Sequence, residues 1–301
     1  MDRKSSLGFG AGDASTPDHF ETLPSRCQDR ESMCSPRKAL LSPWLRFDRF
    51  ETYERKGDMD LLILTGHTSG LGASLLHAGL ERGWTVLGIA RRQSGLERER
   101  FQECTLDLAE TGDWESLLTE RRATLDGPWR RVILINNAGR VEPTALLEEM
   151  SISELQISFQ LNAIAPIRLM RWTLQAFAGP CMRFVNISSG AASKPYLGWT
   201  AYCSTKAALR MSSEVLAREM EAQGRDVRVL SYAPGVLDTA MQVTVRGLST
   251  QTFPDFERFR QLHSQGQLIE PRLSANELLD RLDRSDIPYF SHCRYGESER
   301  S

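Results

Sequence analysis

The sequence predicts an α/β fold of three layers, doubly wound, with a parallel sheet of six to seven strands between two layers of helices. Three observations support this fold class. From residue 60 onward, short apolar runs typical of buried parallel strands alternate with helical segments. A glycine-rich stretch, "LTGHTSGLG" (64–72), joins the first such run to the first helix. Hydrophobic residues make up 41% of the chain and charged residues 25%, as in an ordinary globular domain.

The expected elements follow one another in regular alternation, which implies right-handed βαβ units. Strands are expected at 61–65, 85–90, 102–108, 131–139, 182–189 and 227–235, with an edge strand at 288–297. Helices are expected at 69–82, 112–124, 152–178, 201–222 and 274–284. Pro166 should kink the third helix, and Ser274 with Glu277 forms the pattern of a capping box at the start of the last one. Residues 240–270 show no clear period.

The first 58 residues differ in composition from the rest. They mix glycine, serine, proline and alternating charges, with neither a helical nor a strand period. We expect a disordered N-terminal extension, because so little apolar surface cannot offset the entropy lost on ordering. No apolar segment follows the basic residues, which argues against a secretory signal, and the acidic residues argue against a transit peptide. Met59, directly before the first strand, is an alternative start.

Charge and cysteine content argue against several classes of protein. The net charge of −2 offers no basic surface for nucleic acid or for anionic lipid. No apolar run approaches the roughly 20 residues of a membrane-spanning helix. The six cysteines are scattered without a CxxC pair, so we expect no metal site, no disulfide framework and a cytoplasmic location.

The glycine-rich stretch has the features of a phosphate-binding loop. Gly66, Gly70 and Gly72 allow a tight turn, a close approach of the backbone to a pyrophosphate, and close packing of helix on sheet. The helix that begins at Ser69 would direct free N–H groups at the phosphates. A plain strand-to-helix turn is the alternative. The position after the first strand of a regular α/β pattern favours a dinucleotide, as in Rossmann-type folds.

The pattern TGxxxGxG resembles the loop of the short-chain dehydrogenase/reductase family. Further motifs of that family follow in the same order: "LDL" (106–108), "NNAG" (136–139), "SSGAASKPYLGWTAYCSTK" (188–206) and "PGVLDT" (234–239). The resemblance spans about residues 60–290 and implies one Rossmann-fold catalytic domain over 59–301. It implies that the nicotinamide cofactor is bound by Gly66, Ser69, Gly70, Leu71, Gly72, Arg91, Asp107 (at the adenine amine), Asn137, Ala138, Gly139, Tyr202, Lys206, Pro234, Gly235 and Thr239 (at the carboxamide).

The same resemblance implies four catalytic residues. Ser189 and Tyr202 are 13 residues apart, the separation that the family uses between its serine and its tyrosine, whereas Ser188 is one residue too far. Lys206 follows Tyr202 by one helical turn, so both side chains lie on one helix face. Asn162 matches the asparagine of the family's long fourth helix, where it would anchor a water that relays protons. For Tyr202 and Lys206 alone, an amphipathic helix with incidental neighbours is the alternative.

These residue types suit the reduction of a carbonyl group. The nicotinamide would bring the hydride, and the protein must give a proton to the oxygen. Free tyrosine has a pKa of about 10, and we expect the Lys206 ammonium and an oxidised nicotinamide to lower the pKa of Tyr202. Ser189 would hydrogen-bond the substrate oxygen. Cys203 points about 100° away around the helix and is expected to pack in the core.

The end of the second strand, "GIARRQSG", indicates which dinucleotide is bound. Arg91 and Arg92 stand where an acid usually binds the ribose 2′-hydroxyl of NAD. Arginine favours a 2′-phosphate, so we expect NADP(H) rather than NAD(H), with Arg91 as the first contact. Two solvent-exposed arginines are the alternative. His67 and Thr68 are further candidates for this contact, and His67 could equally be a solvated turn residue.

The stretch "YAPGVLDTAMQ" (232–242) resembles the branch of sepiapterin and benzil reductases. This resemblance implies a small-molecule carbonyl substrate, a ketone or one carbonyl of a vicinal dicarbonyl. Met241, Phe253 and Phe256 would form an apolar substrate lid, with plain core packing as the alternative. No C-terminal acid of the kind that holds a pterin ring occurs in "FSHCRYGESERS". An NAD(P)+-dependent alcohol dehydrogenase and a non-catalytic NADP(H) sensor are the alternative functions.

Assembly is expected from the family resemblance. Members pair through the helices that hold Asn162 and Tyr202, which implies a homodimer or homotetramer. Apolar positions on 152–178 and 205–220 agree with this pairing. A buried crossover helix would show the same pattern and is the alternative.

Overall fold

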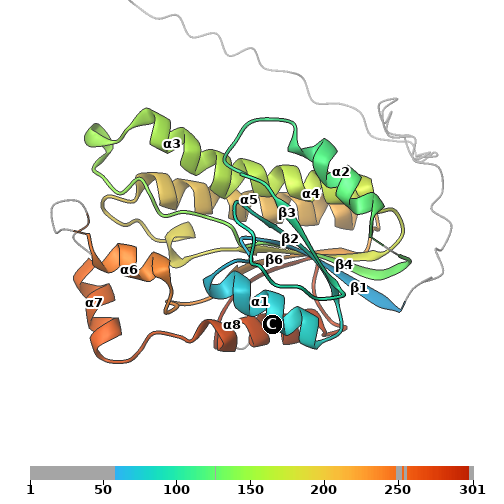
Figure 1. Cartoon of the computed structure of the whole chain (residues 1–301). Coiled ribbons are helices and arrows are strands. Elements are labelled where there is room, and N and C mark those ends of the chain that lie inside the picture. The colour runs from blue at the N-terminus through green and yellow to red at the C-terminus, as the bar shows by residue number, and fades with distance from the viewer. Residues whose placement is uncertain (1–57, 126, 249–252, 254–255, 298–301) are drawn as a thin grey trace, which may run out of the picture. The chain divides into compact units, whose positions relative to one another are not determined.

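Seven strands form one sheet in the order β3-β2-β1-β4-β5-β6-β7 (Figure 1). The computed structural model describes residues 58–125, 127–248, 253 and 256–297. All neighbouring strands pair in parallel. The expected sheet is confirmed, and the segment at 288–297 supplies its edge strand. The strands are β1 (Met59–Thr65), β2 (Thr85–Ala90), β3 (Phe101–Thr105), β4 (Trp129–Asn136), β5 (Cys181–Ile187), β6 (Val227–Ala233) and β7 (Phe290–Arg294).

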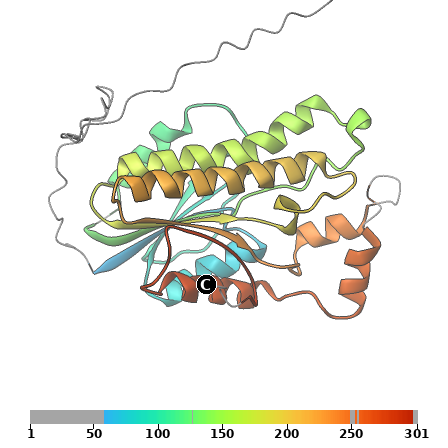
Figure 2. The ribbon, with the colours of Figure 1, turned by 180° about the vertical axis from the view of Figure 1, so that it is seen from behind.

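Helices cover both faces of the sheet (Figures 1 and 2). One face carries α1 (Gly70–Glu81) and α8 (Pro271–Leu282). The other face carries α2 (Trp114–Ala123), α3 (Ile152–Phe159), α4 (Ala165–Ala176) and α5 (Thr200–Ala222). Two short helices, α6 (Ala240–Arg246) and α7 (Phe256–Ser264), lie beyond the carboxyl ends of the strands. The three-layer, Rossmann-type architecture is therefore confirmed.

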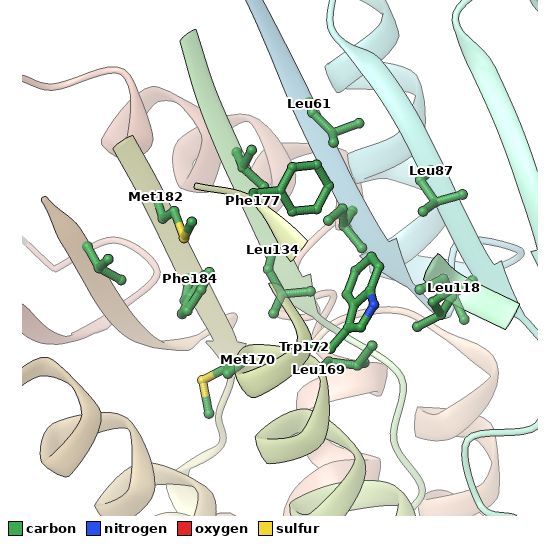
Figure 3. Packing of buried hydrophobic residues seen from close by; sticks show 14 of the residues in the cluster. Leu61, Leu87, Leu118, Leu134, Leu169, Met170, Trp172, Phe177, Met182 and Phe184 are labelled. Atoms are coloured by element: carbon green, nitrogen blue, oxygen red, sulfur yellow. The ribbon is translucent and has the colours of Figure 1, made fainter. Parts of the chain in front are cut away.

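Each face of the sheet has its own apolar core, because successive side chains of a strand point to opposite faces. On β1, Leu61 and Ile63 pack towards α2 and α4, whereas Leu62 and Leu64 pack towards α1 and α8. Figure 3 shows the first of these cores, in which Trp172 of α4 lies against the strands. All four β1 side chains are fully buried, which explains why this strand reads as a continuous apolar run.

The segment 240–270 is more regular than its sequence indicates. The absence of a period predicts no helix there, but α6 and α7 both form in it. These helices have seven and nine residues, so neither fills the window of 11–18 residues over which a helical period becomes visible. In α7, Phe256 and Phe259 are buried at a spacing of three, which is the signal that was available.

The predicted start of the last helix is wrong by one turn. Helix α8 begins at Pro271 with Glu270 as its N-cap, and a proline in the first helical turn is a recognised start signal. Ser274, the predicted cap, lies inside the helix and is fully buried. Its hydroxyl donates to the carbonyl of Pro234 at 3.2 Å and lies 3.1 Å from the hydroxyl of Tyr232. Ser274 therefore joins α8 to the end of β6.

The long helical stretch at 152–178 is interrupted, though not at the proline itself. A π-helical segment, Gln160–Ile164, separates α3 from α4. Pro166 follows it in the first turn of α4, where its missing N–H costs little. The interruption places Asn162 at the widened turn, and such π-bulges occur often at functional sites.

The remaining expectations about the whole chain are tested only in part. The predicted disordered extension at 1–58 lies, except for Asp58, outside the described residues. In the part of the chain that is described, no helix has the length and apolar character needed to cross a membrane. The thiols of Cys104 and Cys203 form no disulfide. The cytoplasmic location stays a prediction.

Candidate active site

A cavity of about 430 Å³ opens at the carboxyl ends of the strands. It lies where the strand order reverses, since the chain runs outward from β1 to β3 and then returns to start β4 on the other side of β1. In doubly wound sheets this is the position where ligands bind. The loops that follow β1, β2, β3, β4, β5 and β6 all contribute to the lining. Of the predicted site residues, all except Gly72 and Asn162 line this cavity.

The glycine-rich loop forms the floor of the cavity. A Cβ on Gly72 would lie 2.0 Å from the carbonyl oxygen of Gly66, so only glycine fits at position 72. The side-chain amide of Asn137 donates to that same oxygen at 3.1 Å and to the carbonyl of Thr65 at 3.0 Å. The hydroxyl of Thr65 accepts the backbone N–H groups of Asn137 and Ala138, each at 2.9 Å. These bonds join the loop after β1 to the loop after β4.

The start of α1 offers hydrogen-bond donors to the cavity. The N-cap residue Ser69 makes no side-chain cap, so the first N–H groups of the helix, from Gly70 onward, keep no partner within the helix. Such donors at a helix N-terminus favour an anion. The bare glycine floor and these free donors fit the pyrophosphate of a dinucleotide.

The ends of β2 and β3 form the region expected to hold the adenosine. Arg91 and Arg92 line the cavity here and are exposed. Asp107 lines it too, and its carboxylate accepts the N–H of Ala109 at 2.9 Å. The guanidinium of Arg91 lies 3.9 Å from this carboxylate, a loose pair on a side chain that is 74% exposed. Arg91 is therefore only loosely held, whereas Asp107 is held in place by its own turn.

His67 does not lie where the sequence suggests. It is buried and outside the cavity lining, so it is neither a solvated turn residue nor a phosphate contact. Its Nε2 lies 2.7 Å from a carboxylate oxygen of Glu103 on β3, and its ring packs edge-on against Phe101. The ring fills the space over Gly88 of β2, where a Cβ would come within 2.7 Å of it. Thr68, the other candidate, does line the cavity.

Glu103 connects the glycine-rich loop to the loop that carries the two arginines. Besides contacting His67, its carboxylate accepts the backbone N–H of Ser94 at 2.7 Å. These hydrogen bonds lower the pKa of Glu103 against the opposing effect of its burial. A single side chain therefore holds two segments of the adenosine region together, a role that the sequence does not reveal.

Tyr202 and Lys206 lie in the first two turns of α5 and reach the cavity together. Tyr202 is 8% exposed and Lys206 is 6% exposed. The ammonium of Lys206 donates to the carbonyl of Ile187 at the end of β5 at 2.8 Å and lies 5.7 Å from the centre of the Tyr202 ring. Ser189 lines the same cavity, and its hydroxyl oxygen accepts the N–H of Ala191 at 3.2 Å. Ser188 also lines the cavity, but its buried hydroxyl has no partner.

Asn162 lies behind the cavity wall. Its Oδ1 accepts the N–H of Arg140 at 2.9 Å, and its amide donates to the Arg140 carbonyl at 2.8 Å. A Cβ on Gly139 would lie 3.1 Å from this Oδ1 and 3.7 Å from the ammonium of Lys206. Asn162 Oδ1 and the ammonium of Lys206 therefore lie on the same side of Gly139, close to one point, while the Asn162 side chain is engaged by the backbone of Arg140. The proton relay assigned to it stays a prediction.

Burial shifts the pKa values of the two central groups in opposite directions. It raises the pKa of Tyr202 to about 12, although the hydrogen bond from Ser189 acts against this shift. It lowers the pKa of Lys206 to about 8. The expected lowering of the tyrosine pKa is therefore not produced by the protein's own groups, because desolvation outweighs them. At neutral pH the phenol keeps its proton and the lysine keeps its charge.

Keeping a charge on buried Lys206 should reduce the stability of the fold. A pKa lowered from 10.5 to about 8 means that the unfolded chain binds more protons between these pH values. The loss of unfolding free energy caused by the buried charge is present in full below about pH 8. Between about pH 8 and 10.5 this loss disappears, so the free energy of unfolding rises with pH. We expect Lys206→Met to raise the free energy of unfolding by on the order of 2 kcal/mol at pH 7.

Urea unfolding of both proteins at pH 7 and near pH 10.5 measures this effect. The difference between variant and wild type should shrink towards zero at the higher pH. Lys194→Met, which changes an exposed lysine, serves as the control and should have no effect at either pH. A gain in stability that does not depend on pH would contradict the assignment to the charge.

Aromatic side chains close the cavity on the side of Tyr202. They differ in part from the apolar lid of Met241, Phe253 and Phe256 that the sequence predicts. Trp199 and Phe259 line the cavity together with Met241. Phe253 is fully buried behind them, stacked on Trp199 with ring centres 4.3 Å apart, and Phe256 is buried as well. The expected lid position is wrong for both of these phenylalanines, which pack as core. Trp199, three residues before Tyr202, is the wall residue that sequence reasoning missed.

One cavity thus joins a glycine-rich anion site to a buried tyrosine, lysine and serine. The sequence profile of the short chain dehydrogenase family matches residues 60–247. The chain belongs to the short-chain dehydrogenase family. Like other short-chain dehydrogenases it is an oxidoreductase that acts on CH–OH or C=O groups and binds a nicotinamide cofactor.

Similar proteins place this short-chain dehydrogenase more narrowly. It is 36% identical over 229 residues to the benzil reductase ((S)-benzoin forming) of Bacillus subtilis, an alignment covering 75% of this chain and 94% of the relative. It is 35% identical over 252 residues to the sepiapterin reductase of Rattus norvegicus, covering 76% and 94% respectively. The crystal structure of the KRED1-Pglu enzyme superposes with a TM-score of 0.67 at 26% identity and covers 77% of this chain and 100% of the other. The suspected branch of the family is confirmed by these relatives.

Proposed function

We propose that this short-chain dehydrogenase is an NADPH-dependent carbonyl reductase. The observation that carries the proposal is the meeting of Tyr202, Lys206 and Ser189 in the cavity that the glycine-rich loop also lines. A bound dihydronicotinamide supplies a hydride, which is the one part of the reaction that side chains cannot provide. The protein groups present suit the remaining tasks, which are to orient the carbonyl and to give a proton to its oxygen.

The proton comes from Tyr202. Its raised pKa keeps the phenol protonated at neutral pH, so the acid is present before reaction. Ser189, which lines the cavity together with this phenol, directs the carbonyl oxygen to the same place. When the phenol gives up its proton, the ammonium of Lys206 stabilises the phenolate that remains. The carbonyl carbon gains the hydride and the oxygen gains the proton, which yields the alcohol.

NADPH is preferred over NADH in this proposal because of the charges at the end of β2. Arg91 and Arg92 line the cavity there, and the lining has no carboxylate in that loop to accept a ribose 2′-hydroxyl. The one carboxylate that lines the cavity, that of Asp107, belongs to the loop after β3 and accepts the N–H of Ala109. Arginine pairs well with a phosphate because its planar donors match the oxygens.

The substrate proposed is a ketone or a vicinal dicarbonyl with an aromatic or otherwise apolar body. Two relatives are a benzil reductase and a sepiapterin reductase by name, and both names describe reductases. The wall of Trp199, Phe259 and Met241 gives this end of the cavity the apolar surface that such a substrate needs. The alternative is that the enzyme runs in the opposite direction, as an alcohol dehydrogenase.

Loss of NADPH absorbance with benzil tests the proposal. We expect turnover with NADPH, slower turnover with NADH, and little oxidation of benzoin with NADP+. Arg91→Ala should raise the KM for NADPH by about tenfold and leave the KM for NADH nearly unchanged, because a charge-assisted hydrogen bond is worth about 1.5 kcal/mol or more. Equal KM values for the two cofactors in the wild type would contradict the NADP preference. Binding of NADPH without any turnover would favour a sensor.

We also propose that the chain forms a homodimer through α4 and α5, which run side by side over one face of the sheet (Figure 2). Both helices expose large apolar side chains, Ile164 just before α4 and Ile167 on it, and Met211 and Val215 on α5. An exposed apolar patch of this kind is typical of an interface between protein chains. Sedimentation velocity of the purified chain tests this, and a monomer at micromolar concentration would contradict it.

A further inference from the structure

The cavity lining is rich in positive charge. It contains five cationic residues besides Lys206 and one carboxylate, that of Asp107; the five are Arg91, Arg92, Lys194, Arg258 and Arg294. Arg91 and Arg92 lie in the adenosine region, where a 2′-phosphate accounts for them. Arg294 ends β7, whose neighbour β6 leads into the Pro234 turn. Lys194 and Arg258 belong to neither region and remain to be explained.

Arg258 lies on the same side of the cavity as the catalytic serine. Its guanidinium donates to the phenol oxygen of Tyr196 at 3.4 Å. A Cβ on Gly190 would lie 3.7 Å from that same oxygen, and Gly190 directly follows Ser189. The phenol of Tyr196 therefore lies between Arg258 and the turn that carries Ser189. The adenosine region, by contrast, is formed by the loops after β2 and β3.

Lys194 belongs to that same turn. Its backbone N–H donates to the carbonyl of Gly190 at 3.0 Å, and its own carbonyl is approached by the thiol of Cys203 at 3.7 Å. The side chains of Lys194 and Arg258 both line the cavity and both are exposed at its mouth. Across the described residues, neither of these two side chains is paired with a carboxylate. Two cations without an anion thus flank the aromatic wall.

We propose that Arg258 and Lys194 bind a carboxylate of the substrate, so that this enzyme prefers a carbonyl compound that also carries an acid group. The proposal rests on the proposed carbonyl reduction and narrows its substrate class to apolar keto acids, for which an aryl keto acid is the simplest probe. The guanidinium of Arg258 holds planar donors that match a carboxylate. Trp199 and Phe259 would contact the apolar body, and Ser189 with Tyr202 would receive the keto oxygen.

The two cations need not be explained by solubility alone. Arg260 is on the same helix α7, is also exposed, and lies outside the cavity lining. It lies 3.9 Å from the carboxylate of Glu257, whereas Arg258 is turned to the cavity and bonded to a phenol. On helix α7, Arg260 therefore pairs with a neighbour on the same helix, whereas Arg258 lines the cavity.

The test compares phenylglyoxylate with its methyl ester, in which a methyl group replaces the negative charge next to the keto group. We expect kcat/KM of the wild type with NADPH to be at least tenfold higher for the acid than for the ester. Arg258→Gln and Lys194→Gln should each reduce this ratio severalfold, and the double variant should bring it close to one. Arg260→Gln is the matched control and should keep the wild-type ratio.

Equal kcat/KM for acid and ester in the wild type would overturn the proposal, as would a ratio that both Gln variants leave unchanged. A second measurement separates this outcome from failure of the proposed function. Binding of mandelate and of methyl mandelate in the presence of NADP+ is followed by tryptophan fluorescence. Tighter binding of mandelate that is lost in Arg258→Gln supports the anion site even if no ketone is reduced. Equal binding of the two compounds overturns it.

Discussion

Replacing Tyr202 with phenylalanine is expected to lower kcat/KM for carbonyl reduction by on the order of a thousandfold, which is the range for removal of a positioned general acid. The change deletes one oxygen and keeps the ring, which packs edge-on against Trp199 at 5.3 Å between ring centres. The aromatic wall therefore stays in place. Ser189 and Lys206 remain, but neither is positioned as Tyr202 is to give a proton to the carbonyl oxygen.

Stability and cofactor binding should change little in this variant. The variant loses one hydroxyl group, whose hydrogen bond is worth about 1 kcal/mol. NADPH titration by fluorescence should give a dissociation constant within about twofold of the wild type, since the glycine-rich loop and Arg91 are untouched. Tyr289→Phe, which changes a half-buried tyrosine outside the cavity, is the matched control and should keep full activity. Wild-type turnover in Tyr202→Phe would reject this tyrosine as the acid.

Replacing Gly72 with alanine should be the most damaging small substitution in the domain. The added methyl would lie 2.0 Å from the carbonyl oxygen of Gly66 and 2.6 Å from the amide nitrogen of Asn137. Neither atom is free to move, because that carbonyl and that amide are hydrogen-bonded to each other. Forcing them apart should cost about 3 kcal/mol or more of unfolding free energy and should open the floor on which the pyrophosphate is expected to lie.

Urea unfolding and NADPH titration together measure the effect of Gly72→Ala. We expect a lower midpoint of unfolding and a dissociation constant for NADPH raised by at least tenfold. Gly112→Ala provides the control, because no atom lies within 4 Å of a Cβ at that position and its stability should change by about 0.5 kcal/mol or less. A Gly72→Ala protein with unchanged midpoint and affinity would show that the loop can adapt, contrary to the close contact described.

Sequence alone predicts well the strands that are buried on both faces and the helices that are long enough to show several turns of their period. The central strands are apolar on both faces, and α5 has 23 residues, so both give strong signals. Three of the four catalytic candidates, Ser189, Tyr202 and Lys206, also follow from sequence, because their spacing is tied to the first turns of α5 and to the turn after β5. These three meet in the cavity, whereas Asn162, from the π-helical segment before α4, lies outside the lining and beside Gly139.

What sequence could not predict depends on contacts between distant segments. The burial of His67 requires the missing side chain of Gly88, 21 positions later, and the acid of Glu103 on a third strand. The identity of the wall residues depends on how α7 folds back onto Trp199, with ring centres of Trp199 and Phe259 5.8 Å apart. The raised pKa of Tyr202 depends on burial, which no spacing of residues reports.

Positions 67 and 88 occupy one shared volume, since the imidazole of His67 lies where a side chain at 88 would begin. A bulky residue is compatible with one of these positions only while the other is bare. If an ancestral chain had a small residue at position 67 and a side chain at position 88, position 88 had to become glycine before a histidine could occupy position 67. In an alignment of related chains the two columns should covary, and a large residue in both should be absent.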